Sequence, residues 1–115
     1  MMAIIEFEDE VESSEVGSSK EIQKQKLINA LNKLGINYDI NGDQVRIPGL
    51  ASEIYNGTII VDQPPDTRIV FEEYADVNKI VLNTTGPIKP GLIQIVFDKS
   101  VKAYYDFPYL IVQFD

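Results

Sequence analysis

Residues 18–36 have the three-to-four-residue apolar period of an amphipathic helix, and they form the one long helical stretch of this 115-residue chain. At 100° per residue, the apolar side chains fall on one arc of roughly 160°. They are Leu27, Ile28, Ala30, Leu31 and Leu34. The remainder of the chain is therefore expected to pack against this one helical face.

Both ends of the helix carry sequence signals. Ser18 and Glu21 form an S-x-x-E capping box, in which the serine oxygen accepts a hydrogen bond from a free amide and the glutamate returns to the cap. At the other end, Gly35 can take the left-handed conformation that lets Ile36 fold back on Leu31. The sequence thus predicts a helix that begins after Ser18 and ends at Gly35.

A β-hairpin is predicted at residues 36–47, centred on Asn41 and Gly42. Asn-Gly suits a type I′ turn because both central residues of that turn need a positive φ. A two-residue loop at this point pairs Tyr38 with Val45, so the apolar residues of both strands share one face. The turn makes Gly42 the sensitive glycine of this region, ahead of the glycine in the Pro-Gly pair that follows.

Beyond the hairpin, short β-branched or aromatic runs alternate with turn residues. The predicted strands span residues 58–62, 67–74, 79–84, 92–97, 101–106 and 109–114. Residues 92–97 form a nearly continuous apolar run, typical of a central strand covered on both faces. Residues 50–55 fit a helical turn or a strand. Short connections favour antiparallel pairing, so the predicted fold class is α+β, with a single long N-terminal helix packed on a mostly antiparallel sheet of about seven strands.

The net charge of −8 is unevenly distributed. Residues 1–18 carry six acids and no base, the helix carries a net +3, and residues 35–115 carry a net −5. Acidic, serine-rich sequence buries too little apolar surface to fold. We therefore predict an acidic, mobile N-terminal segment at residues 1–17 and a single compact domain at residues 18–115. The pattern leaves open whether residues 2–8 form a strand.

Cysteine and histidine are both absent. Without cysteine there is no disulfide framework, so a reducing, cytoplasmic location is expected. No apolar run approaches the length of about 18 residues that a membrane-spanning helix needs. Without histidine, the usual general base, the usual transition-metal ligand and every Ser-His-Asp or Cys-His arrangement are excluded. The chain is predicted to be no enzyme, with no catalytic residue, no cofactor and no metal site.

Two carboxylate patterns fit structural roles better than chemical ones. Glu72 and Glu73 are adjacent in a predicted strand, so their side chains point to opposite faces and cannot act as a dyad. Residues 39–43 have the D-x-N-x-D spacing that opens an EF-hand loop. However, Gln44 stands where glycine is needed, and Leu50 stands where a glutamate closes the calcium shell. The hairpin prediction explains the same residues.

Acids of the β half are the first candidates for partner binding. An acidic surface repels nucleic acid and anionic membranes, and it speeds encounters with basic proteins. The candidates in or beside the predicted strands at 58–74 are Asp62, Asp66, Glu72 and Glu73.

An aromatic cluster supplies the second group of candidates. Residues 104–109 hold four aromatic residues in six positions, and tyrosine is a good interface anchor because it is amphipathic and rigid. Tyr104, Tyr105 and Tyr109 are therefore predicted to bind the partner. The alternative is that these rings fill the core and cap a sheet edge.

Three classes of function remain after these exclusions. The first is a non-enzymatic acidic binding protein that docks on a basic surface of a protein partner. A short acidic chain without histidine, cysteine or a catalytic motif resembles, in composition alone, many virus-encoded inhibitors, including nucleic-acid mimics. That resemblance implies inhibition of a nucleic-acid-binding or defence protein in the host cytoplasm. The second class is a self-assembling structural subunit, for example of a virion, hence a homo-oligomer; the third is a small-ligand binder or a carboxylate-based enzyme.

Overall fold

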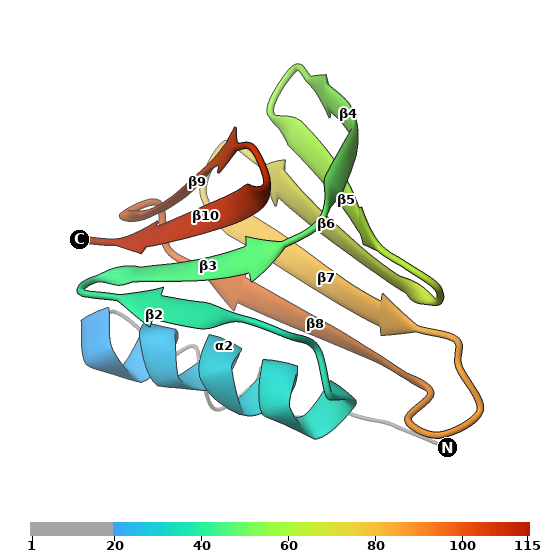
Figure 1. Cartoon of the computed structure of the whole chain (residues 1–115). Helices are drawn as coiled ribbons and strands as arrows, with labels where there is room; N and C mark the ends of the chain where they lie inside the picture. The colour runs from blue at the N-terminus through green and yellow to red at the C-terminus, as the bar shows by residue number, and fades with distance from the viewer. Residues whose placement is uncertain (1–19) are drawn as a thin grey trace.

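The computed structural model describes residues 20–115, and Figure 1 draws residues 1–19 as a grey trace. The predictions for residues 1–17, for a strand at 2–8 and for the cap at Ser18 therefore lie outside the described residues. The described part is α+β, with one helix and two antiparallel sheets, which confirms the predicted class. It contains nine strands, more than the predicted number, and they divide between two sheets.

Strand order defines the two sheets. The four-stranded sheet runs β2 (Asp39–Asn41), β3 (Gln44–Pro48), β10 (Tyr109–Phe114) and β9 (Val101–Asp106). The five-stranded sheet is a meander of β4 (Leu50–Tyr55), β5 (Thr58–Gln63), β6 (Thr67–Glu73), β7 (Asn78–Thr84) and β8 (Gly91–Phe97). The sequence left residues 50–55 open between a helical turn and a strand, and in the structure they form a strand.

Helix α2 (Lys20–Leu34) ends as its sequence predicts. Gly35 takes a φ of +69°, and its amide donates to the Asn32 carbonyl at 3.2 Å. The Ile36 amide donates to the Leu31 carbonyl at 2.9 Å. These two bonds form a Schellman cap, which satisfies carbonyls that the helix end leaves free.

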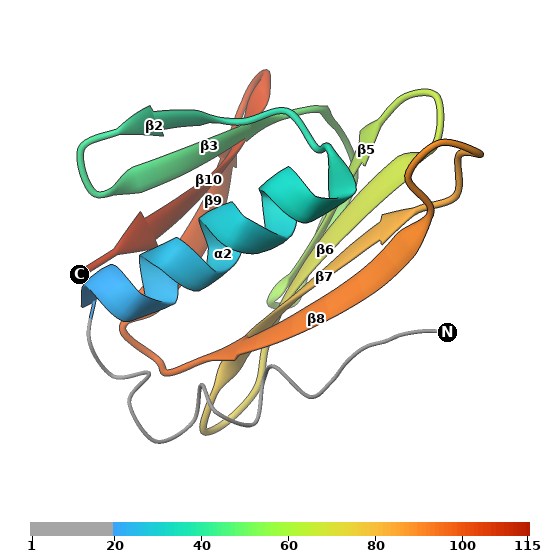
Figure 2. The same cartoon turned by 90° about the horizontal axis from the view of Figure 1, so that it is seen from below.

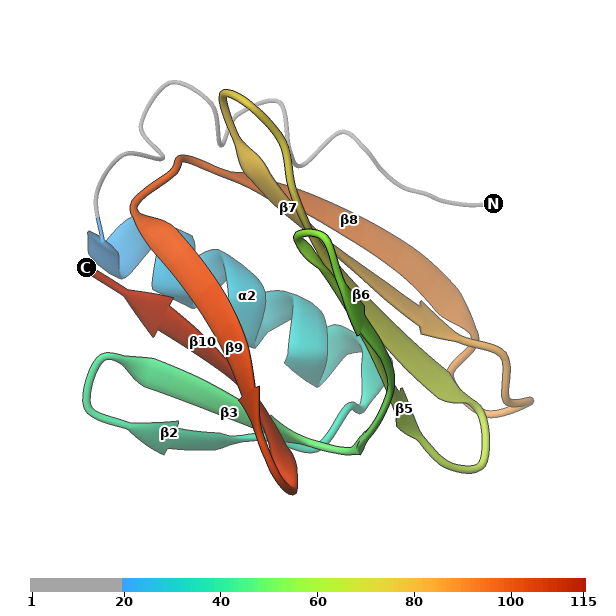
Figure 3. The same cartoon turned by 90° about the horizontal axis from the view of Figure 1, so that it is seen from above.

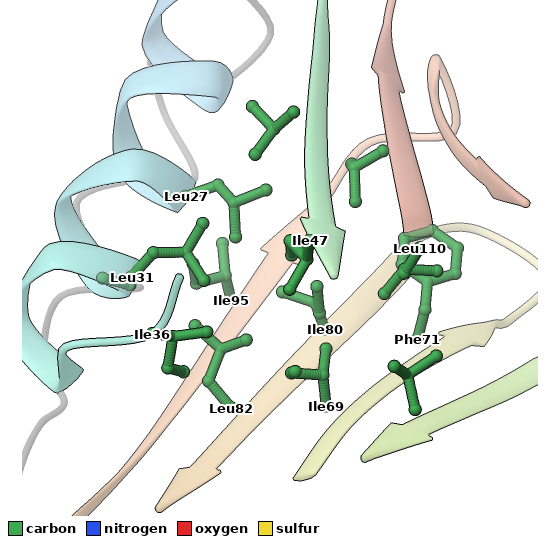
Figure 4. Packing of buried hydrophobic residues seen from close by; sticks show 14 of the residues in the cluster. Leu27, Leu31, Ile36, Ile47, Ile69, Phe71, Ile80, Leu82, Ile95 and Leu110 are labelled. Atoms are coloured by element: carbon green, nitrogen blue, oxygen red, sulfur yellow. The ribbon is translucent and has the colours of Figure 1, made fainter. Parts of the chain in front are cut away.

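The core lies where the helix meets the inner faces of both sheets. Seen from below, α2 runs between β2–β3 on one side and β7–β8 on the other (Figure 2). Leu27 and Leu31 approach Ile47 of β3 and Ile95 of β8 in the close view (Figure 4). The predicted helical face is buried except for Ile28, which is partly buried against the core. One helix therefore joins the two sheets into a single hydrophobic core.

The hairpin at β2–β3 has a different register from the predicted one. Val45 pairs with Ile40, two residues beyond Tyr38, and the loop consists of Gly42 and Asp43. Gly42 has a φ of +62°, but Asn41 is not among the residues with positive φ. The physical reason is the helix cap, which holds Ile36 in the core and so removes it from the strand.

The type I′ signature belongs to the other Asn-Gly pair of the chain. Asn56 and Gly57 take φ values of +55° and +84° in the turn between β4 and β5. Tyr55 and Thr58 pair directly on either side of this turn. Both central residues have the positive φ that this turn requires.

Strand β8 is an edge strand, so the prediction of a central strand covered on both faces is wrong. Its side chains alternate, with Ile95 and Phe97 buried in the core, while Leu92 and Val96 are 59% and 37% exposed. An apolar run reveals high apolar content but cannot show whether the second face has a cover. Within residues 20–115, the outer face of β8 has none.

A buried side chain that the helical period did not mark fixes the start of α2. Gln23 is buried, and its amide oxygen accepts the Asp98 backbone N–H at 2.9 Å. Its amide nitrogen donates to the Asp98 carboxylate at 3.3 Å. Asp98 also accepts from the amide and the hydroxyl of Ser100. This network ties the helix to the turn between β8 and β9.

Acid should weaken this network. Burial by itself would raise the pKa of the Asp98 carboxyl, but hydrogen bonds from Ser100 and Gln23 outweigh it and hold the pKa below its usual value. A lowered folded-state pKa adds stability that is present above the unfolded pKa of about 3.9 and is lost as the pH falls through the folded pKa. We expect Asp98→Asn to be less stable than the unmodified chain near pH 7, and this difference should shrink as the pH falls through the lowered folded pKa of Asp98. Urea unfolding at a series of pH values measures the free energy of unfolding of the two proteins. A difference between them that stayed the same at every pH would contradict the expectation.

Candidate protein-docking surface

The four predicted acids do not form one surface, because they lie at opposite ends of β5 and β6. Asp62 lies near the end of β5, and Asp66 lies in the turn that leads into β6. Glu72 and Glu73 lie at the far end of β6. The first five residues of β6, 67–71, separate Asp66 from Glu72.

Asp62 is neutralised by a neighbouring base. The Arg68 Nε and Nη2 atoms donate to its two carboxylate oxygens at 2.8 Å and 3.3 Å. The two residues are direct partners in the β5–β6 ladder. Hydrogen bonds from Arg68 hold the pKa of the Asp62 carboxyl below its usual value. Its charge is therefore compensated within the sheet and adds little to the attraction of a basic partner.

Asp66 holds two loops together. Its backbone carbonyl accepts the Thr85 amide at 2.9 Å, and its carboxylate accepts the Thr67 hydroxyl at 3.2 Å. A Cβ on Gly86 would lie 1.9 Å from a carboxylate oxygen of Asp66. The side chain is thus packed against the loop after β7, and its contacts are those of a loop anchor.

Glu72 and Glu73 lie among exposed tyrosines at the other end of the five-stranded sheet. Tyr55, at the end of β4, is 70% exposed, and Tyr74, which follows β6, is 46% exposed. Asp76 is exposed in the same loop as Tyr74. We call these five residues the acidic–aromatic end: Tyr55, Glu72, Glu73, Tyr74 and Asp76.

Antiparallel pairing brings the acidic–aromatic end together. Thr58 of β5 is the direct partner of Tyr55 on one side and of Glu72 on the other. The Glu73 amide donates to the Gly57 carbonyl at 2.9 Å, so the end of β6 lies against the β4–β5 turn. Residues from three parts of the sequence thus share one end of the sheet.

The acidic–aromatic end already binds one ammonium group. Lys79 of β7 places its Nζ 5.1 Å from the centre of the Tyr74 ring and 3.7 Å from Glu72 Oε1. The Tyr74 hydroxyl donates to the same Glu72 oxygen at 2.9 Å. A ring face together with a carboxylate is a favourable site for a cation. Within residues 20–115, no base pairs with Glu73 or Asp76 and none lies over the Tyr55 ring, so these three residues remain available to a base of a partner.

The three predicted tyrosines of residues 104–109 divide between the two faces of the other sheet. Tyr105 packs against the core, and its hydroxyl donates to the Gly49 carbonyl at 2.6 Å. Tyr104 and Tyr109 lie on the outer face: Gln44 donates to the Tyr104 hydroxyl at 3.2 Å, and the Arg46 guanidinium lies 6.0 Å from the Tyr109 ring centre. The Tyr109 ring therefore already faces a base of its own sheet.

Tyr55, Tyr74 and Asp76 are the members of this surface that sequence reasoning missed. In an antiparallel meander, the end of β4, the start of β5, the end of β6 and the start of β7 all lie at the same end of the sheet. Applied to the predicted strands, that rule would have put both tyrosines beside the two glutamates. The signal was thus present in the strand order and not in any local motif.

Residues 20–115 contain no group of three or more acidic side chains arranged to hold a metal ion. The helix in this part of the chain is too short and too polar to cross a membrane. No protein-family model, no curated protein and no solved structure matches the chain significantly.

Proposed function

We propose that this chain is a non-enzymatic binding protein whose acidic–aromatic end docks on a basic surface of a protein partner. The observation that carries the proposal is the site of Lys79, where a tyrosine ring and a glutamate of this end already bind an ammonium group. Tyr55, Glu73 and Asp76 offer a partner's lysine or arginine the same types of group, a tyrosine ring and carboxylates. Tyrosines supply contact area at low entropic cost, and carboxylates supply charge selection.

The distribution of charge supports a local docking surface and not a uniformly acidic domain. Residues 20–115 hold twelve acids and all ten bases of the chain, so this part is nearly balanced. Asp62 is neutralised by Arg68, whereas Glu73 and Asp76 are exposed at the acidic–aromatic end. The compositional resemblance favours a nucleic-acid-binding protein as partner, which this chain would inhibit by occupying its basic groove.

A lysine-rich peptide tests the docking chemistry directly. We expect its titration into the full chain to shift the backbone amide NMR signals of Tyr55, Tyr74 and Asp76. Screening should weaken the effect as salt rises from low to physiological strength, where charges act over about 8 Å. Glu73→Lys combined with Asp76→Lys should weaken binding about tenfold, or 1.4 kcal/mol.

Tyr104 provides the matched control, because it is as exposed as Tyr74 but lies on the other sheet. Tyr55→Ala should weaken peptide binding, and Tyr104→Ala should leave it unchanged. An acidic peptide of equal length should shift neither group of signals. Shifts centred on Tyr104 and Tyr109, or binding that ignores salt, would refute the acidic–aromatic end as the docking surface.

A further inference from the structure

The four sheet edges in residues 20–115 differ in their protection against pairing with another chain. An exposed edge strand offers free N–H and C=O groups, and proteins guard such edges with charges, bulges or shortness. β2 has three residues. β4 has an irregular register between Ala51 and Glu53, and β9 contains Lys102 and Asp106.

β8 has none of these guards. Its seven residues, Gly91–Phe97, contain no charge and no proline, and they pair with β7 in unbroken register. Figure 3 shows β8 at the margin of the five-stranded sheet, beyond β7. Because an antiparallel strand directs its hydrogen-bonding groups alternately to its two sides, about half of them point away from β7.

The sequence of β8 is complementary to itself. Residues 92–96 read Leu-Ile-Gln-Ile-Val, so residue types repeat in mirror order around Gln94. In an antiparallel pair related by a two-fold axis at Gln94, Leu92 of one copy faces Val96 of the other, and Ile93 faces Ile95. Gln94 then faces Gln94. Every pair matches apolar with apolar or amide with amide, and no like charges meet.

We propose that β8 pairs with β8 of a second copy of this chain, antiparallel and about a two-fold axis at Gln94. The pairing joins two five-stranded sheets into one continuous sheet and satisfies the free backbone groups of both edges. It also places Leu92 of each copy beside Val96 of the other, and both are exposed apolar side chains in the single copy. A strand that contained charges or a proline would fit this edge less well, because it would set a charge beside an apolar side chain or lack a backbone N–H.

The second copy does not compete with the proposed docking function. Pairing uses the free edge of β8, whereas the acidic–aromatic end is built from β4, β6 and the loop after β6. The two-fold axis would place the two acidic–aromatic ends at opposite ends of the joined sheet, because the paired strands run antiparallel. The dimer would therefore present two docking surfaces, and either proposal can fail without the other.

Opposite charges at Gln94 test the two-fold axis. The full chain should sediment as a dimer that dissociates on dilution. Gln94→Lys and Gln94→Glu each place two like charges face to face at the axis, and each should raise the dimer dissociation constant about tenfold or more. An equimolar mixture of the two variants should restore dimers, because unlike charges then meet. Gln25→Lys, the same substitution on the exposed helix face, is the control and should not change the dissociation constant.

A single cysteine tests the register, since the chain has none of its own. Gln94→Cys should form a disulfide-linked dimer under mild oxidation, and Gln25→Cys should remain monomeric. Three results would overturn the proposal. The first is that the full chain is monomeric at all concentrations. The second is that Gln94→Lys and Gln94→Glu each dimerise as tightly as the unmodified chain. The third is that dimers form only after residues 1–16 are deleted. The third result would assign the β8 edge to the N-terminal segment of the same chain.

Discussion

Replacement of Gly49 by alanine is expected to lower the free energy of unfolding by about 3 kcal/mol, because the added methyl group has no room. A Cβ at this position would lie 2.4 Å from Val61 Cγ1 and 2.9 Å from the backbone carbonyl of Asp62. Backbone cannot yield as the end of a flexible side chain can. The added methyl group therefore disrupts the packing of β5 against the corner that Gly49 forms between β3 and β4.

The corner cannot move away, because it is held on both sides. Gly49 is the single residue between β3 and β4, so the chain passes there from one sheet to the other. Its amide donates to the Pro108 carbonyl at 2.9 Å, and its carbonyl accepts the Tyr105 hydroxyl at 2.6 Å. A shift that relieved the contact with Val61 would break these bonds to the β9–β10 hairpin.

Gly42→Ala is the control for this prediction. Gly42 has a φ of +62°, which costs an alanine about 1 kcal/mol, but no atom lies within 4 Å of the added Cβ. Urea unfolding followed by circular dichroism should rank Gly49→Ala well below Gly42→Ala in stability. This order reverses the one that turn chemistry alone predicts. Equal losses would show that the corner relaxes freely.

Local signals explain what the sequence could predict of the fold. The helix end depends on Gly35 and its two neighbours, and the strands at residues 58–114 depend on β-branched runs between turn residues, so both were accessible. The division into two sheets was not, because it depends on Gly49 passing between β10 and β5, and a Pro-Gly pair looks like any other strand break. The register of β2 was predicted wrongly for a related reason. The Ile36 amide bonds to the Leu31 carbonyl in the helix cap, so Ile36 does not belong to the strand.

The candidate surface shows the same limit. Glu72 and Glu73 could be selected from the sequence because they are adjacent acids in a strand. Their setting could not, since Tyr55 joins them only through the pairing of β4, β5 and β6. Asp62 looked equivalent to them in sequence, yet Arg68 neutralises it across the ladder. Charge counts locate acids, and pairing decides which of them a partner can use.

Asn78 is the second residue whose loss should have a large effect. It lies at the start of β7, is 1% exposed, and donates from its side-chain amide to the Val101 carbonyl of β9 at 2.6 Å. Its amide oxygen accepts from Lys99 Nζ at 2.8 Å, and the same ammonium group donates to the Tyr74 carbonyl at 2.8 Å. One amide thus links the two sheets and fixes the loop that carries Tyr74.

We expect Asn78→Ala to lower the free energy of unfolding by about 3 kcal/mol, since it leaves a buried carbonyl and an ammonium group without their partner. Asn78→Asp should be equally harmful, because a carboxylate keeps the bond from Lys99 but presents an oxygen to the Val101 carbonyl. Asn83→Ala, on the outer face of the same strand, should change stability by about 0.5 kcal/mol or less. Urea unfolding compares the three. If Asn78→Asp were as stable as the unmodified chain, the side chain of Asn78 would act through its shape alone. A loss of stability in both Asn78 variants would assign the effect to the donated hydrogen bond that links β7 to β9.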